Sequence, residues 1–191
     1  MTDIHWWRQL SADWKSAFGT AFFHYSNEPT AEELAQLYQT TVLRFSGPAA
    51  PYPNMAFELS DLSGIAPLHN LELLVATHHQ INNIEALSSL KKMKNLFLFN
   101  NKIQSLKGIE SLTALEQLYV QCNRIESLEP IKSLSNLREV YIHDNHLSTL
   151  EGLTEEHSEK LTKFFCMPGN SLPQKEIIRV ENNLGIRCRA L

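Results

Sequence analysis

The stretch LEQLYVQCNRIESL, residues 115–128, combines two kinds of order. Leu118 and Val120 stand one residue apart, and the intervening Tyr119 begins a second, outward-facing series. This alternation is typical of a half-buried strand. A polar amide, Asn123, then follows within the apolar series. The stretch therefore predicts a short strand that ends in a turn with an inward-facing asparagine.

The same pattern recurs at a spacing of 22 residues. Moving back by that spacing gives MKNLFLFNNKIQSL (93–106), and moving forward gives LREVYIHDNHLSTL (137–150). Moving back twice gives LELLVATHHQINNI (71–84), which is weaker but in register. Self-similarity at a fixed period indicates a repeat architecture built from one short structural unit.

A single unit cannot bury its apolar side, so the units are expected to stack as a solenoid. Their strands would lie about 4.8 Å apart in a parallel sheet, with the inner side chains in columns. The turn after each strand leaves backbone N–H and C=O groups unpaired, and an asparagine amide can satisfy both. We therefore expect a structural asparagine ladder of Asn101, Asn123 and Asn145, with His79 in the same position one unit earlier.

These units resemble the leucine-rich repeat family, in particular the 22-residue subclass of phosphatase-regulatory subunits and internalin-type bacterial proteins. The resemblance extends over residues 59 to 172 or so. It implies an α/β fold, a right-handed solenoid with a curved parallel β-sheet of about five to six strands. It also implies protein interaction in general and names no partner.

The return segments between strands are too short for a long helix and its two loops. Cap-type residues recur at one position of each return segment, which predicts 3₁₀-type turns on the convex side: Asp61, Asn83, Ser105, Ser127 and Thr149. Five strands fit the pattern clearly. A sixth is expected in AAPYPNMAF (49–57), where prolines and Phe57 in the asparagine position disturb it.

Both ends of such a solenoid expose apolar core and need caps. We divide the chain into a helical N-terminal cap (1–47), the solenoid (48–172) and a C-terminal capping helix and tail (173–191), in one continuous unit. The first segment carries tryptophan and phenylalanine at helical spacing, followed by a TAEE capping box that opens a helix reaching Leu43.

The C-terminal segment is expected to form a helix capped by Ser171 and ending near Gly185. Its apolar side would cover the last unit with Ile177, Ile178 and Leu184. At the other end, the WWRQLSADWKSAF stretch is similar to the leading segment of small bacterial repeat proteins and favours a bacterial source.

Composition narrows the class of protein. No stretch approaches about 18 consecutive apolar residues and the start lacks a secretory hydrophobic region, so we expect no membrane association. Three cysteines without a CxxC pair suit a reducing cytosol, which predicts a cytoplasmic protein. The net charge is −4, and Lys163 is the only cation in the strand-facing columns of the clear repeats. We therefore expect no nucleic-acid partner.

Motifs for chemistry are missing from the sequence. It contains no GxxxxGK[ST], GxSxG or HExxH, and so we expect neither an enzyme nor a cofactor. The HH pair (78–79) and HDNH (143–146) suggest metal ligands, but His78 and His143 would lie three units apart, about 14 Å. Cys122 is a candidate accessible thiol with only Arg124 nearby to activate it.

The outward columns carry the functional prediction. They form an apolar stripe with a mixed polar border, and such a patch is seldom left without a partner. We predict a protein- or peptide-binding face on the concave sheet, made by Phe97, Phe99, Tyr119, Gln121, Glu139, Tyr141, His143, Asp144 and Phe165.

Other readings stay open. The aromatic columns could serve only to stabilise the sheet. The protein could instead be a regulatory or targeting subunit of an enzyme, or a structural protein that self-associates through this face. We expect a monomer or a weak homodimer.

Overall fold

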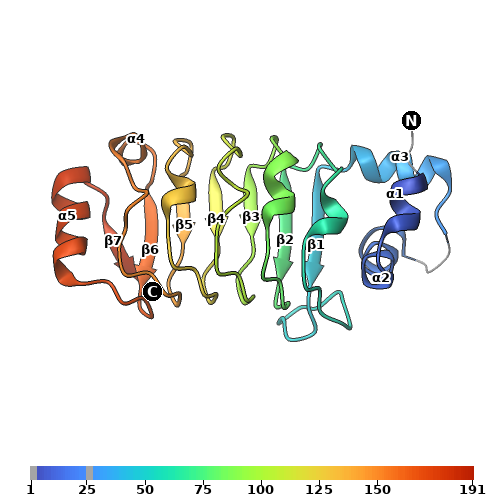
Figure 1. Ribbon diagram of the computed structural model, residues 1–191, viewed down its shortest axis with the longest axis horizontal. Helices are drawn as coiled ribbons and strands as arrows, with labels where there is room; N and C mark the ends of the chain where they lie inside the picture. Colours follow the sequence, from blue (N-terminus) through green and yellow to red (C-terminus); the bar gives the residue numbers. More distant parts are fainter. Residues whose placement is uncertain (1–3, 25–27) are drawn as a thin grey trace.

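The computed structural model describes residues 4–24 and 28–191 and shows an elongated stack of coils built on one open parallel sheet (Figure 1). The sheet has seven strands in chain order, each pairing with the next. They are β1 (Val42–Ser46), β2 (Leu73–Thr77), β3 (Asn95–Phe97), β4 (Gln117–Tyr119), β5 (Glu139–Tyr141), β6 (Lys163–Met167) and β7 (Cys188–Ala190). We call one strand with the return segment that follows it a coil.

The sheet has two strands that the sequence analysis did not expect, so the predicted number of five to six strands was too low. The sixth strand predicted within 49–57 is absent, and the first strand is β1, inside the segment expected to be helical. Leu43 pairs in register with Leu74, 31 residues later and nine more than the repeat period. That insertion hides the strand from a search at fixed spacing. The other unexpected strand, β7, lies in the C-terminal tail.

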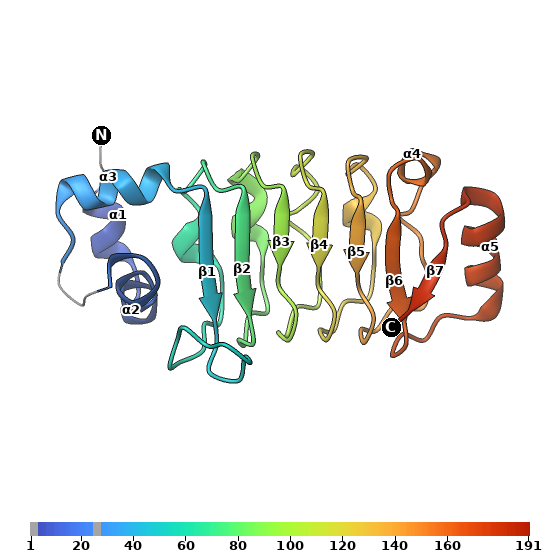
Figure 2. The ribbon, with the colours of Figure 1, turned by 180° about the vertical axis from the view of Figure 1, so that it is seen from behind.

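The inserted residues form a loop that is fixed to β1. Asn54 Oδ1 accepts a hydrogen bond of 2.6 Å from Ser46 N, and Asn54 Nδ2 donates to Arg44 O at 2.7 Å. Met55 is buried and anchors the loop to the core. Phe57, expected at the asparagine position, therefore belongs to this loop, which projects beyond the carboxyl end of β1 (Figure 2).

The return segments contain short 3₁₀ helices: η2 (Ser63–Ile65), η3 (Glu85–Ser89) and η4 (Glu129–Ile131). Four of the five polar residues in the predicted column cap the turns, because each of these side-chain oxygens accepts a hydrogen bond from the backbone N–H two residues later. The distance is 2.7 Å for Asp61, 2.8 Å for Asn83, 3.1 Å for Ser105 and 3.2 Å for Ser127.

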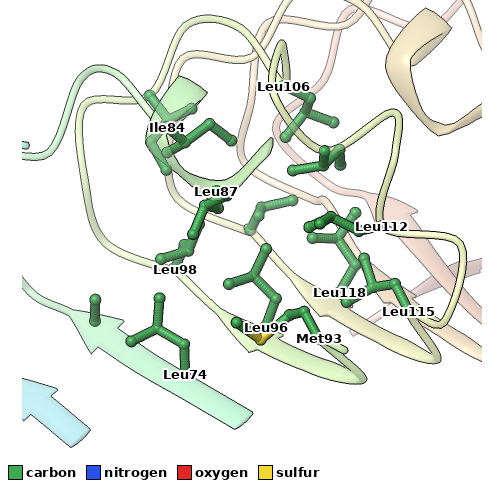
Figure 3. Packing of buried hydrophobic residues seen from close by; sticks show 14 of the residues in the cluster. Leu74, Ile84, Leu87, Met93, Leu96, Leu98, Leu106, Leu112, Leu115 and Leu118 are labelled. Atoms are coloured by element: carbon green, nitrogen blue, oxygen red, sulfur yellow. The ribbon is translucent and has the colours of Figure 1, made fainter. Parts of the chain in front are cut away.

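Columns of aliphatic side chains fill the space between the sheet and the return segments. Leu74, Leu96 and Leu118 follow one another inside β2, β3 and β4 and are fully buried (Figure 3). The core continues without interruption from Trp7 to Cys188. Each central coil buries both of its sides against neighbours, which is why a unit without a helix can be stable here.

An amide ladder runs along the turns that follow the strands. Asn123 Oδ1 accepts from Ile103 N of the preceding coil at 3.0 Å, and its Nδ2 donates to Leu98 O and Val120 O, both at 3.0 Å. Asn101 and Asn145 make the same set of bonds. His79 bonds with Leu59 N and Phe45 O through its two ring nitrogens. Asn170, which the sequence analysis missed, completes the ladder.

At the N-terminal end, helices cover the first coil: α1 (Ile4–Gln9), α2 (Ala12–Phe18), a π-helical turn η1 (Gly19–Phe23) and α3 (Ala31–Gln39). Trp14 packs edge-on against Phe45 of β1, with ring centroids 5.4 Å apart. A Cβ on Gly64 would lie 2.1 Å from the Trp14 indole, so only glycine permits this close approach. Thr30 and Glu33 form the expected capping box.

At the C-terminal end, α5 (Gln174–Leu184) covers the last coil and leads into β7. Its N-cap is Pro173 and not Ser171, while Gly185 ends it in the left-handed conformation as expected. Val180 is the fully buried residue of this helix, whereas Ile178, expected to cover the core, is 47% exposed. Within residues 4–24 and 28–191, no helix is long and apolar enough to cross a membrane.

Candidate functional site

The outward side of the sheet carries a continuous row of aromatic rings. Phe97, Tyr119, Tyr141 and Phe165 occupy paired positions on β3 to β6, and we call these four residues the aromatic row. Successive ring centroids are 4.8, 4.2 and 4.5 Å apart. The strand spacing of about 4.8 Å sets this distance, because equivalent residues on adjacent strands point the same way.

The row is held by a hydrogen-bonded network. Tyr119 Oη donates to Glu139 Oε2 at 2.6 Å, and Lys163 Nζ lies 3.0 Å from Glu139 Oε1. The Tyr119 hydroxyl and Lys163 hold the pKa of Glu139 below its usual range. Burial, together with the Glu139 charge, raises the pKa of Tyr119. Glu139 is therefore a fixed anion whose charge is already compensated within the molecule.

The rings lean on one another, which limits what they can bind. Tyr141 and Phe165 are stacked with 20° between their planes, and Tyr119 is tilted by 34° from Tyr141 on its other side. Both faces of the Tyr141 ring are thus covered by neighbouring rings, and its edge is presented outward. Bases stack on exposed ring faces. This arrangement instead suits lateral contact with apolar side chains.

Next to the aromatic row lies a second row formed by Phe99, Gln121 and His143, three of the residues assigned from the sequence. His143 was expected on the outward side, yet it is only 7% exposed, whereas Phe99 and Gln121 are half-buried. Its Nδ1 lies 2.8 Å from Asp144 Oδ2. His143 Nε2 and Gln121 Oε1 are buried and have no hydrogen-bond partner among the described residues.

A turn edge follows the strands, formed by His78, Asn100, Cys122 and Asp144. All four have positive φ, between 53° and 60°. Asparagine and aspartate tolerate this left-handed conformation, which is a signal the sequence analysis overlooked. Burial and the nearby Asp144 raise the pKa of Cys122, so its thiol stays protonated and is a poor nucleophile.

A polar groove of about 470 Å³ lies at this turn edge, beneath the loop after β1. Its walls include Glu58, His78, Lys102 and Cys122. Asn100 Nδ2 lies 2.9 Å from His78 Nε2, so this ring nitrogen is already hydrogen-bonded within the protein. In the described part of the chain, no three histidine, cysteine, aspartate or glutamate side chains are grouped as they would be around a metal ion.

The structure adds two residues to the sheet side that the sequence analysis missed. Arg44 of β1 and Arg189 of β7 both point outward, and their strands extend the sheet at its two ends. The Arg189 guanidinium carbon lies 6.0 Å from the centre of the Phe165 ring. Neither residue was accessible to repeat alignment, because β1 and β7 lie outside the regular 22-residue spacing.

Comparison with known proteins agrees with this geometry. A family model described as leucine rich repeats (2 copies) matches residues 91–133 and 113–155. The chain is similar to the solved structure of an internalin from Listeria monocytogenes, with 23% identity, a TM-score of 0.60 and 70% of the chain covered. It is also similar to a leucine-rich repeat protein from Leptospira interrogans, with 25% identity, a TM-score of 0.64 and 83% covered.

The match spans 38% of the length of each of these two structures. Comparison with curated proteins gave no match. The likeness to the internalin concerns the fold alone, whereas the family model matches the repeat sequence itself. Leucine-rich repeat proteins generally bind other proteins. Residues 91–155 are thus leucine-rich repeats, and the amide ladder and the open parallel sheet show that the chain has the fold of a leucine-rich-repeat solenoid.

Proposed function

We propose that this protein is a non-enzymatic binding module that holds a protein or peptide segment on the outward side of its sheet, centred on Tyr119 and Tyr141. The observation that carries the proposal is the aromatic row, four half-buried rings in contact across four strands. Contiguous apolar patches of this kind mark interaction sites. Rigid aromatic side chains also lose little conformational entropy when a partner covers them.

The network around Glu139 supports the same proposal. Because Tyr119 is bonded to Glu139, and Glu139 to Lys163, the central ring is held in one position before any partner arrives. Such preorganisation increases affinity because less order has to be imposed on binding.

The test is a selection of random twelve-residue displayed peptides on the immobilised protein, followed by affinity measurements on the enriched peptides. Tyr119→Ala and Tyr141→Ala should each weaken binding by about 2 kcal/mol, roughly thirtyfold. The control, Tyr119→Phe/Tyr141→Phe, keeps both rings and should retain most of the affinity. Denaturant midpoints are measured for every variant.

A double alanine variant with lowered stability and unchanged peptide affinity would show that the rings only stabilise the sheet. Light scattering on the wild type addresses the homo-oligomer alternative. A dimer that the double alanine variant breaks would make self-association the role of this side of the sheet. Assignment as a regulatory subunit would require an enzyme that copurifies with the wild type and is lost with the double variant.

A further inference from the structure

The aromatic row is the middle of a longer row that crosses the whole sheet. Strand register aligns Arg44 with Val75 and Val75 with Phe97 at one end. At the other end it aligns Phe165 with Arg189. One outward residue from each of the seven strands is therefore in line, with an arginine at both ends and apolar or aromatic residues between them.

Both arginines are available for a carboxylate. Among the described residues neither forms a salt bridge, and the side-chain hydrogen bonds they make go to backbone carbonyls, Tyr52 O for Arg44 and Thr162 O for Arg189. Arg189 Nε is buried and has no hydrogen-bond partner in the part of the chain that the structure describes. The Arg189 side chain as a whole is only partly buried, so its terminal nitrogens can meet a carboxylate in the fork geometry that arginine favours.

The centre of the row, in contrast, offers no free charge. Glu139, the acidic residue beside the rings, is bonded to Tyr119 and Lys163. Asp144 lies at the turn edge, beyond the end of β5 and outside the row. Charge complementarity thus places the partner's acidic groups at the two ends and apolar groups over the rings.

We propose that this side of the sheet binds an extended peptide segment with a carboxylate near each end and apolar side chains between them. This inference rests on the proposed function and specifies its ligand. Six strand spacings of about 4.8 Å separate the arginines by about 29 Å. An extended chain advances about 3.3 Å per residue, so the two carboxylates are about nine residues apart.

The experiment uses four pools of fluorescent peptides with random apolar residues in the interior. Three pools are ten residues long and carry glutamate, glutamine or lysine at both ends. The fourth carries glutamates only four residues apart. Fluorescence anisotropy gives the affinity of each pool for the wild type, Arg44→Gln, Arg189→Gln, the double arginine variant and Tyr119→Ala/Tyr141→Ala. Arg124→Gln is the matched control, because it removes one exposed arginine from a turn away from the row.

The pool with widely spaced glutamates should bind tightest. Each arginine variant should lose about threefold to fivefold in affinity and the double variant about tenfold, with the loss reduced at high salt. Arg124→Gln should stay within about twofold. The glutamine pool should bind the wild type and the double arginine variant about equally. The lysine pool should bind the double variant more tightly than the wild type, because the arginines repel it.

The other outcomes are separable. Equal binding of all pools, with affinity still lost in the tyrosine variant, would overturn the acidic-ended ligand and leave the proposed binding face intact. The arginines would then serve to keep the edge strands β1 and β7 from pairing with other chains. Binding that the tyrosine variant does not weaken, or no binding by any pool, would overturn both proposals.

Discussion

The central coils, built on β3, β4 and β5, differ from the coils at the two ends. They differ in the sequence spacing between successive strands and in what packs against each coil. Equivalent residues of the central strands are 22 residues apart. The spacing from Leu43 to Leu74 is nine residues longer than this period, and the spacing from Leu137 to Leu161 is two residues longer. A central coil has two similar neighbours, so its side chains must match in size. A terminal coil has one such neighbour and one helical cap, and its loops are free to change length.

In the centre, the constant 22-residue spacing places one ring on each strand. The ends supply the arginines, the caps and the anchored loop. His157 shows how the two-residue insertion near the C-terminal end is accommodated. It is fully buried in α4 (Glu155–Ser158), where its ring nitrogens lie 3.1 Å from Thr154 N and 3.2 Å from Ile131 O. An inserted turn therefore still satisfies its buried polar groups.

The largest loss of stability is expected from a substitution in the N-terminal cap. Trp14→Ala should cost about 3–5 kcal/mol, since it leaves a cavity over β1 next to Phe45 and Gly64. Trp6→Ala, at a partly exposed ring of the same cap, should cost less. Urea denaturation gives the free energies, and hydrogen exchange should show protection lost in β1 before β4. Equal loss of protection in both strands would mean that the cap does not act locally.

A smaller effect is expected in the centre. Asn123→Leu should cost about 1–3 kcal/mol, because Ile103 N, Leu98 O and Val120 O would lose their partner in a buried turn. Gln121→Leu, two residues earlier, should change stability by about 0.5 kcal/mol or less, since its Oε1 has no partner to lose. Comparable shifts in the denaturant midpoints of both variants would contradict the distinction between ladder and sheet-side residues.

The smallest effect concerns the ladder position where a histidine replaces asparagine. Burial lowers the pKa of His79 below its ordinary value of 6.5, with Glu58 opposing and His78 adding to the shift. The unfolded chain then binds the proton more readily, so stability present above pH 6.5 is lost as the pH falls below it. In His79→Asn this loss should shrink, and the remainder should belong to His78 and His157, whose pKa values burial also lowers.

Urea midpoints between pH 8 and pH 5 measure this difference, with Asn101→His as the converse variant. A pH profile for His79→Asn that coincides with the wild-type profile would show that this position does not couple folding to protonation. The same data test whether an asparagine makes the first turn equivalent to the central turns.

Much of the fold was predictable from the central coils. Leu118, Val120 and Asn123 each recur at fixed spacing, so strand alternation, burial and the turn amide could be read together. The aromatic row followed from the same alignment, because residues 22 apart in sequence are neighbours in the sheet. Its use as a binding surface remains a prediction.

The terminal coils were less predictable for a physical reason. Leu43 and Phe45 alternate like any short strand, but the loop after them removes the spacing that would identify their partner. In α5, Val180 is fully buried while Ile178 is 47% exposed, and both are apolar, so hydrophobicity alone could not show which side of the helix meets the core.

The amino-acid sequence by itself determined the repeat, the inward amides and the rings on successive strands, because these depend on local alternation and on a period that stacking turns into contact. Tertiary structure alone decided that Arg44 and Arg189 close the two ends of that row, since their strands join the sheet from outside the periodic region. It also decided that His143 is buried although its position faces outward. Such features depend on which segments meet across the sheet, and no local pattern encodes that.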